Sequence, residues 1–230
     1  QWSSPLVWDV FSVLTYATVS LVFWYVDLLP DLASIRDRAE RTWVRRLYGI
    51  FSLGWRGSAR HWARFETLYL ILAALATPLV ISVHSIVGMD FAAAQVPGWH
   101  STIFPPYFVA GAIFSGFAMV LTLAIPLRKF YRMENLITER HLDLCAKLML
   151  ATGLIVAYGY FAENVMAWNS GDPFERHIFN YRAGGREAPL YWLLLFCNVV
   201  VPQALWWSKN RTRPARLFAI SILVNVGMCT

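Results

Sequence analysis

A histidine and an aspartate lie six residues apart at the end of a long apolar stretch, in the segment His84-Ser-Ile-Val-Gly-Met-Asp90. Such a pair can take a proton from a hydroxyl group, because the carboxylate stabilises the imidazolium that forms. Gly88 lies between the two residues, and we expect it to loosen the backbone so that Asp90 can act as the partner of His84. Ionisable side chains at a membrane boundary indicate a functional site by default.

Two further acids lie within apolar stretches. Asp9 is either a proton acceptor or an interfacial aspartate favoured by the positive end of a helix dipole. Glu163 is either a step in a proton path or a structural acid that is hydrogen-bonded beside Asn164. Asp27 and His141 lie near the opposite boundary, where they are ordinary interfacial charges or, in the second interpretation, belong to the same proton path.

The sequence lacks the motifs of several kinds of catalytic site. Its three cysteines are far apart, with no CxxC or CxxCH, so it predicts no covalent haem, no iron–sulfur cluster and no disulfide framework. A bis-histidine haem is disfavoured because the histidines other than His84 lie in or beside loops, at His61, His100, His141 and His177. There is also no phosphate-binding loop, no HExxH and no nucleophile elbow. We therefore expect no metal in this chain.

The composition indicates a membrane protein. The 230 residues are 57% hydrophobic and only 15% charged, whereas soluble domains are about 45–50% apolar and about 25% charged. The net charge of +6 is spread between apolar stretches and forms no single patch. The basic residues are thus interpreted as topology determinants, and no nucleic-acid partner is expected.

The fold class expected from the apolar stretches is all-α, a polytopic bundle of transmembrane helices. Each of five stretches is long enough to cross a hydrocarbon core about 30 Å thick and lacks the alternation typical of strands. They cover roughly residues 6–29, 67–87, 107–127, 142–168 and 189–207, and a sixth, shorter stretch begins near residue 216.

The distribution of Lys and Arg predicts the orientation. Of the 20 basic residues, 17 lie in three connections, at residues 30–66, 128–147 and 209–216. The alternate connections, residues 88–106 and 169–188, hold none and three. The positive-inside rule makes the first group cytoplasmic, which places the N-terminus, Asp9, His84, Asp90 and Glu163 at the outer face.

The whole chain, residues 1–230, is expected to be a single integral membrane region and a fragment of a longer protein. Within it, residues 31–66 form an amphipathic cytoplasmic connection. Residues 32–43 alternate in charge at helical spacing and are expected to lie along the membrane surface. Gly54 and Gly57 predict a break between two short helices.

Several segments together resemble the NrfD/polysulfide reductase family, and within it the quinol-binding integral membrane subunit of bacterial alternative complex III. The most specific are Ser4-Pro-Leu-Val-Trp-Asp9, Leu53-Gly-Trp-Arg-Gly57, His84 to Asp90, and Pro97-Gly-Trp-His-Ser-Thr-Ile-Phe-Pro-Pro-Tyr107 running on to Gly116. Ala167-Trp-Asn-Ser-Gly171 and Phe196-Cys-Asn-Val-Val-Val-Pro-Gln203 also resemble this subunit. The similarity covers essentially the whole chain.

The resemblance implies two four-helix bundles with flanking helices in the complete protein, located in a bacterial inner membrane. It also implies a menaquinol or ubiquinol site near the periplasmic face, formed in part by Asp9, His84 and Asp90. Electrons would pass to an iron–sulfur subunit and then to a multihaem c-type cytochrome, beside a paralogous membrane subunit and membrane lipid. A further family histidine would precede Gln1, and Asn169 stands where many relatives have tyrosine.

Three alternative functions stay open. The first is the membrane anchor of a molybdenum or multihaem reductase of the same family, in which electrons can run the other way. The second is the paralogous subunit, which is structural or proton-conducting and binds no quinol. The third is a secondary transporter, which would carry broken helices and acids at mid-depth.

Overall fold

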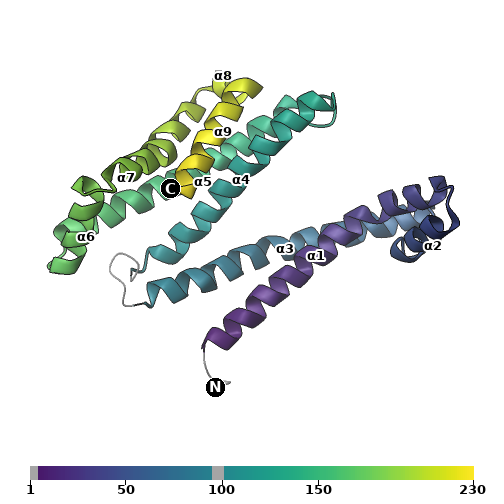
Figure 1. Ribbon diagram of the computed structural model, residues 1–230, viewed down its shortest axis with the longest axis horizontal. Coiled ribbons are helices and arrows are strands. Elements are labelled where there is room, and N and C mark those ends of the chain that lie inside the picture. The colour runs from purple at the N-terminus through teal and green to yellow at the C-terminus, as the bar shows by residue number, and fades with distance from the viewer. Residues whose placement is uncertain (1–4, 95–100) are drawn as a thin grey trace. The chain divides into compact units, whose positions relative to one another are not determined.

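The computed structural model describes residues 5–94 and 101–230, and within these ranges the regular structure is entirely helical (Figure 1). The loop Gln95–His100, which the sequence places at the outer face, lies outside the described residues. The elements are α1 (Pro5–Arg38), α2 (Thr42–Phe51), α3 (Ala59–Ala92), α4 (Phe104–Phe130), α5 (Glu139–Asn169), α6 (Pro173–Gly184), α7 (Ala188–Leu195), η1 (Phe196–Val200), η2 (Val201–Trp206), α8 (Ser208–Arg211) and α9 (Pro214–Cys229).

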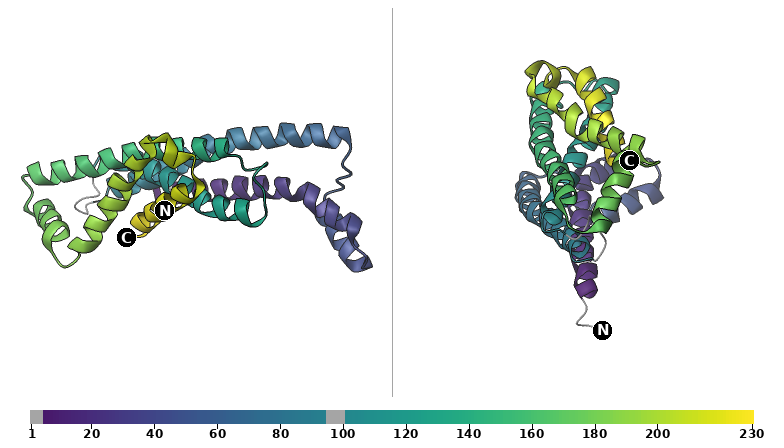
Figure 2. Two further views of the ribbon diagram at one scale, coloured as in Figure 1. Left: turned by 90° about the horizontal axis from the view of Figure 1, so that it is seen from above. Right: turned by 90° about the vertical axis from the view of Figure 1, so that its left-hand side faces the viewer.

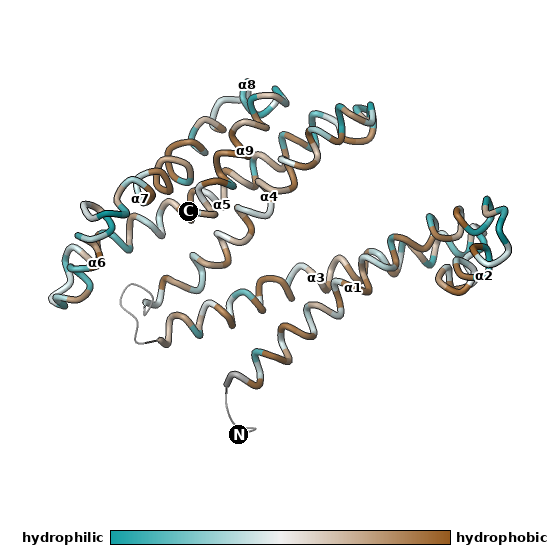
Figure 3. The backbone as a smooth tube through the Cα atoms, in the orientation of Figure 1, coloured by the Kyte–Doolittle hydropathy of each residue, from teal (hydrophilic) through white to brown (hydrophobic). Residues whose placement is uncertain are grey.

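Among the residues that the structure describes, five helical segments are long and apolar enough to cross a membrane, which confirms the expected all-α polytopic class. They are Val7–Arg38, Ala59–Ala92, Phe104–Phe130, Glu139–Asn169 and Ala188–Trp206, and the shorter apolar helix α9 follows. Hydropathy along the backbone shows apolar central stretches and polar turns at the arginine-rich ends (Figure 3).

Most of these helices extend beyond the apolar stretches of the sequence. Helix α1 continues through Pro30 to Arg38, so residues 32–38 belong to the spanning helix and do not form a separate surface helix. The tolerance of Pro30 agrees with the general behaviour of long membrane helices, in which neighbouring groups satisfy the carbonyl that proline leaves unpaired.

The chain divides into two compact units, residues 1–86 and 87–230, and each is described by itself. In the first unit, α1 and α3 meet through two pairs of aromatic rings. The rings of Phe23 and Tyr69 meet edge-on with centroids 4.9 Å apart, and those of Tyr16 and His84 do so at 6.3 Å. These ring contacts join two helices whose outward faces are highly exposed and apolar, as expected for helices surrounded by lipid.

A tight connection joins α2 to α3 and is held by Arg36. The Arg36 guanidinium donates to the Ser52 hydroxyl at 3.1 Å and to the Trp55 carbonyl at 2.9 Å. Gly54 and Gly57 have φ of 72° and 65°, a conformation that glycine adopts without steric cost. The expected break at these glycines is confirmed, but the helix that follows it is the long α3 and not a short one.

In the second unit, α4, α5 and α9 pack against one another (Figure 2). Their buried apolar side chains form one continuous core. Phe114, Met149, Leu217 and Val224 are fully buried there. A polar cluster crosses the same core, because Thr122 donates to Ser221 at 2.9 Å and receives a hydrogen bond from Asn225 at 2.9 Å. Hydrogen bonding of this kind commonly joins helices within a membrane.

The fifth spanning segment is not a uniform α-helix. After α7 it widens into the π-helix η1 and then tightens into the 3₁₀-helix η2 around Pro202. Proline lacks an N–H, so the carbonyl four residues earlier, that of Asn198, loses its usual helical donor. The Asn198 side chain is fully buried, and neither its nitrogen nor its oxygen has a hydrogen-bond partner.

Candidate functional site

Asp9 lies in the second turn of α1, on the first unit. Its Oδ2 atom is shielded from solvent and has no hydrogen-bond partner. Burial of a carboxylate oxygen without a partner is costly, so such an atom in a native structure requires an explanation. Tyr16 follows seven residues later, on nearly the same face of the helix and about 10 Å along it.

His84 faces this side of α1 from α3. Its ring meets the edge of the Tyr16 ring, with centroids 6.3 Å apart. Its Nδ1 atom lies 2.8 Å from the Val80 carbonyl oxygen. A carbonyl can only accept, so Nδ1 carries the proton and Nε2 is the basic atom of the neutral ring. The first unit thus brings His84 and Tyr16 together, and it places Asp9 on the same face of α1 as Tyr16.

Asp90 is exposed near the end of α3, which is helical without interruption from Ala59 to Ala92. Six residues of helix place Asp90 about 120° around the axis from His84 and about 9 Å along it. The expected loosening at Gly88 is therefore wrong, and the helix does not turn these two side chains toward each other. A side chain at Gly88 would instead meet Pro105, because an added Cβ would lie 3.0 Å from the Pro105 Cα.

Aromatic rings lie close to Asp90 in the second unit. The Phe91 ring lies 5.8 Å from that of Phe104 and 6.1 Å from that of Phe108. The Phe104 ring in turn lies 6.2 Å from that of Tyr107, which meets Tyr160 edge-on at 5.4 Å. This row of rings runs from the end of α3 to a polar cluster on α5.

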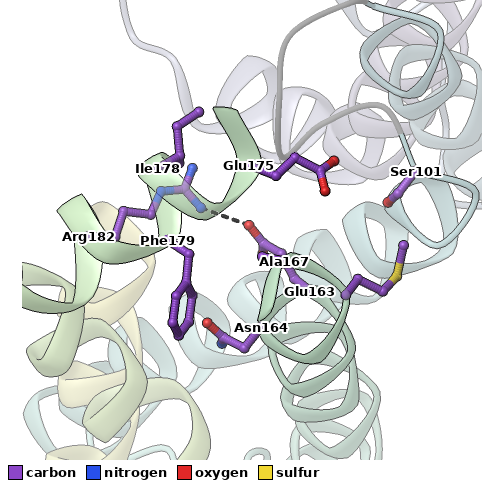
Figure 4. A pocket seen from close by; sticks show the side chains of 9 residues that line it. Ser101, Glu163, Asn164, Ala167, Glu175, Ile178, Phe179 and Arg182 are labelled. Carbon is purple, nitrogen blue, oxygen red and sulfur yellow. Dashed lines mark hydrogen bonds and ion pairs between the residues drawn. The ribbon is translucent and has the colours of Figure 1, made fainter. Parts of the chain in front are cut away.

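The polar cluster is centred on an ion pair between Glu163 of α5 and Arg182 of α6 (Figure 4). The Arg182 Nη1 donates to Glu163 Oε1 at 2.7 Å, and the two side chains are 39% and 32% exposed for Arg182 and Glu163 respectively. Helix α6 begins at the Asp172 cap, whose carboxylate accepts from the Phe174 amide at 2.9 Å. This cap starts α6 directly after α5, so that Arg182 lies opposite the last turns of α5.

Asn164 extends the cluster to a further helix. Its Oδ1 accepts from the Tyr191 hydroxyl of α7 at 2.6 Å, and its Nδ2 donates to the Tyr160 carbonyl at 2.7 Å. The sequence predicts Asn164 beside Glu163, but it does not predict Arg182 or Tyr191 there. Arg182 is one of only three basic residues in residues 169–188, and that rarity was a usable signal.

Two cavities flank the ion pair. One, of about 60 Å³, lies between Glu163, Arg182 and Glu175, and Figure 4 shows these side chains around it with Ser101 and Phe179. The other is an open cleft of about 330 Å³ on the side of Tyr107, Tyr160 and Tyr191. Here carboxylate, guanidinium and phenol groups border an apolar wall.

The remaining candidates have simple structural surroundings. The Nδ1 of His141 lies 3.2 Å from the Thr138 amide and 3.0 Å from its hydroxyl, so His141 completes a capping box at the start of α5. Asp27 is exposed on α1. Across residues 5–94 and 101–230, no three His, Cys, Asp or Glu side chains are grouped so that they could hold a metal ion.

The sequence matches the family described as Polysulphide reductase, NrfD, over residues 1–230. The chain belongs to the NrfD polysulphide reductase family. It is also similar to a putative membrane subunit of dimethyl sulfoxide reductase from Halobacterium salinarum, with 30% identity over 97% of this chain. The chain spans about half of that relative, 49% of its length. The family and the five apolar helices together identify an integral membrane protein.

Proposed function

We propose that this chain is part of the membrane subunit of a respiratory redox complex and binds quinol beside Asp9 and His84. The observation that carries this proposal is the buried Oδ2 of Asp9, which lacks a hydrogen-bond partner. A quinol hydroxyl would supply the missing donor. The Tyr16 and His84 rings provide the aromatic wall that a quinone ring requires.

The proposed chemistry balances without a metal in this chain. Oxidation of quinol to quinone releases two protons and two electrons. Asp9 accepts one hydroxyl proton, and the second passes to the Nε2 of His84, the basic atom of its ring. The electrons leave to an iron–sulfur subunit, and from there to a c-type haem subunit or to a reductase.

The resemblance to a dimethyl sulfoxide reductase membrane subunit favours one particular form of this proposal. In that form the chain anchors a reductase, and the electrons of quinol pass through an iron–sulfur partner to the reductase. The alternative complex III form sends the same electrons to a c-type cytochrome. Both forms use quinol as the donor, and quinone type is left open between menaquinone and ubiquinone.

Asp90 and Glu163 fit a second role in this scheme, as groups that carry protons to the outer face. The row of rings from Phe91 to Tyr160 and the ion pair of Glu163 with Arg182 support it, since they line one end of the second unit. The periplasmic position of this end is inferred from the Lys and Arg distribution.

The site is tested in the assembled complex with the variants Asp9→Asn and His84→Gln. Each removes a proton acceptor and nearly preserves shape, so we expect quinol oxidation to fall by at least about tenfold. The assay follows reduction of the electron acceptor with a water-soluble quinol. Assembly is checked by co-purification of the partner subunits.

Asp31→Asn is the matched control, because Asp31 is an exposed aspartate on the opposite end of α1. We expect wild-type turnover for it. Wild-type turnover in Asp9→Asn and His84→Gln, with complete assembly, would refute the quinol site.

A further inference from the structure

A shallow groove of about 350 Å³ follows the arginine-rich end of α3. One end of it is lined by Arg60 and Arg64, which are one helical turn apart, and the other end by Thr67, Leu68 and Ile71. Leu68 and Ile71 are 42% and 58% exposed. The groove therefore changes from cationic to apolar in the direction in which α3 enters the membrane.

The two arginines of the groove have no ion-pair partner among the described residues. Two guanidinium groups at i and i+4 lie on one side of a helix, at a spacing that lets both donate to one phosphate. Their positive charges lie in the connection that holds eight of the 20 basic residues. An anionic group is the expected ligand of such a pair.

A smaller cavity of about 170 Å³ adjoins the groove and shares Arg64 and Leu68 with it. It is bordered by Trp55, whose ring meets that of Trp62 edge-on at 5.2 Å and that of Phe65 at 5.7 Å. Tryptophan is typical of the headgroup level of a membrane. The aromatic cluster thus indicates the depth at which the two arginines lie.

Helix α2 gives independent evidence for the same depth. Trp43, Leu47 and Ile50 lie on one face and are 63%, 43% and 72% exposed, so none of them is buried against the rest of the unit. Arg45 and Arg46 lie on other faces of this helix. A short helix with one apolar face and several arginines is typical of segments that lie in the plane of the interface.

We propose that the groove binds an anionic phospholipid. Its phosphate lies between Arg60 and Arg64, and an acyl chain follows Thr67, Leu68 and Ile71 into the bilayer. Helix α2 lies in the adjoining headgroup layer with Leu47 and Ile50 in contact with lipid. The proposal rests on the membrane location alone and is independent of the quinol site.

The test uses the full-length complex in bilayers of phosphatidylcholine that contain trace spin-labelled phosphatidylglycerol or phosphatidylcholine. Electron spin resonance gives the immobilised fraction of each label, and their ratio measures selectivity. We expect wild type to prefer phosphatidylglycerol, and Arg60→Gln with Arg64→Gln to lower the ratio by about twofold or more. Arg60→Lys with Arg64→Lys, which keeps both charges, is expected to retain most of the selectivity.

Lys129→Gln with Arg132→Gln is the matched control, because it removes two exposed charges from another connection on the same side. An equal loss of selectivity in this control would overturn the proposal, as would full selectivity in the arginine-to-glutamine variant. If the arginine-to-glutamine variant fails to assemble, the proposal is tested with the lysine variant and with a photocrosslinking residue at Ile71. Crosslinking of Ile71 to phospholipid supports the groove, and crosslinking to another protein refutes it. Inorganic phosphate that abolishes the preference at millimolar concentration would show a free-anion site and also refute it.

Discussion

The Glu163–Arg182 pair shows how a partner changes the electrostatic surroundings of a carboxylate in an apolar helix. In the sequence, Glu163 is an isolated carboxylate in an apolar helix, and such a group is costly in a membrane. In the structure Arg182 neutralises it from the next helix at 2.7 Å. Because both side chains are about one-third exposed, solvent screens the pair and its net stabilisation is modest.

Removing only one partner of this pair should destabilise the protein more than removing both. Arg182→Gln leaves the Glu163 carboxylate uncompensated, so we expect a loss of about 1 kcal/mol. Glu163→Gln added to Arg182→Gln should restore part of it. Thermal unfolding of the purified protein in detergent measures the difference. Arg186→Gln, an exposed neighbour, is the control, and additive effects of the two changes would contradict the prediction.

Asn198 offers a second prediction at the scale of single residues. Its amide is fully buried without a partner, so it loses its hydration on folding and gains no hydrogen bond. Asn198→Leu, which has a similar branched shape, should leave stability unchanged or raise it by about 1 kcal/mol. The midpoint of thermal unfolding measures this change. A clear loss of stability would mean that the amide has a polar partner, such as a bound water.

Among the elements, the contact of η1 with α9 depends on a missing side chain. A Cβ on Gly227 would lie 2.7 Å from the Oδ1 of Asn198 and 3.0 Å from its Cγ. Small residues permit such close approach of helices in membranes. Gly227→Ala should therefore force the helices apart and cost about 1–3 kcal/mol.

Gly116→Ala is the matched control for this change. Gly116 lies in the middle of α4, and a Cβ there meets nothing within 4 Å. Alanine favours helix more than glycine does, so this substitution should be neutral or stabilising. Comparison of the two unfolding midpoints checks the prediction. Equal effects would show that packing at Gly227 is not limiting.

The helices were predicted from the sequence where they have a local pattern of apolar residues, and they were mispredicted where they do not. Apolar length identified all five spanning helices, because a hydrocarbon core requires about 20 apolar residues. The continuation of α1 to Arg38 was not predicted, because the apolar stretch ends before the helix does and the last residues of the helix are charged. Gly88 was misinterpreted as flexible, since its close contact with Pro105 comes from another helix and leaves no local pattern.

The candidate site was predictable only in part for the same reason. Asp9 and His84 are candidates from the sequence because they are ionisable residues within apolar stretches. Tyr16 is not, because a tyrosine in an apolar helix is unremarkable until its ring is found against His84. Arg182 and Tyr191 were missed because their partners are 19 and 27 residues away, a separation that no helical repeat connects.

For the whole molecule, the distribution of basic residues predicts which ends of the helices face the cytoplasm. A cysteine at Gly171, between α5 and α6, should react with a membrane-impermeant maleimide in intact cells. A cysteine at Glu134, between α4 and α5, should react only after permeabilisation. Both positions are exposed in the structure. The background carries alanine at Cys145, Cys197 and Cys229.

Reversed labelling of these two positions would show that the topology is the opposite of the predicted one. It would place the Asp9 and Glu163 ends in the cytoplasm, and the quinol protons would then be released inside. Labelling of both positions in intact cells would instead indicate broken cells, which a cytoplasmic marker protein detects. The proposed direction of proton release therefore depends on this measurement.

The wide turn of η1 also has a consequence for how relatives are compared. A π-helical turn holds one residue more than the α-helical turn it replaces, so it corresponds to a single insertion within an otherwise regular helix. Relatives without that residue align with this chain only through a one-residue gap between Phe196 and Val200. Without that gap, every position after the π-helical turn would be paired with the wrong neighbour of the relative, one residue out of register.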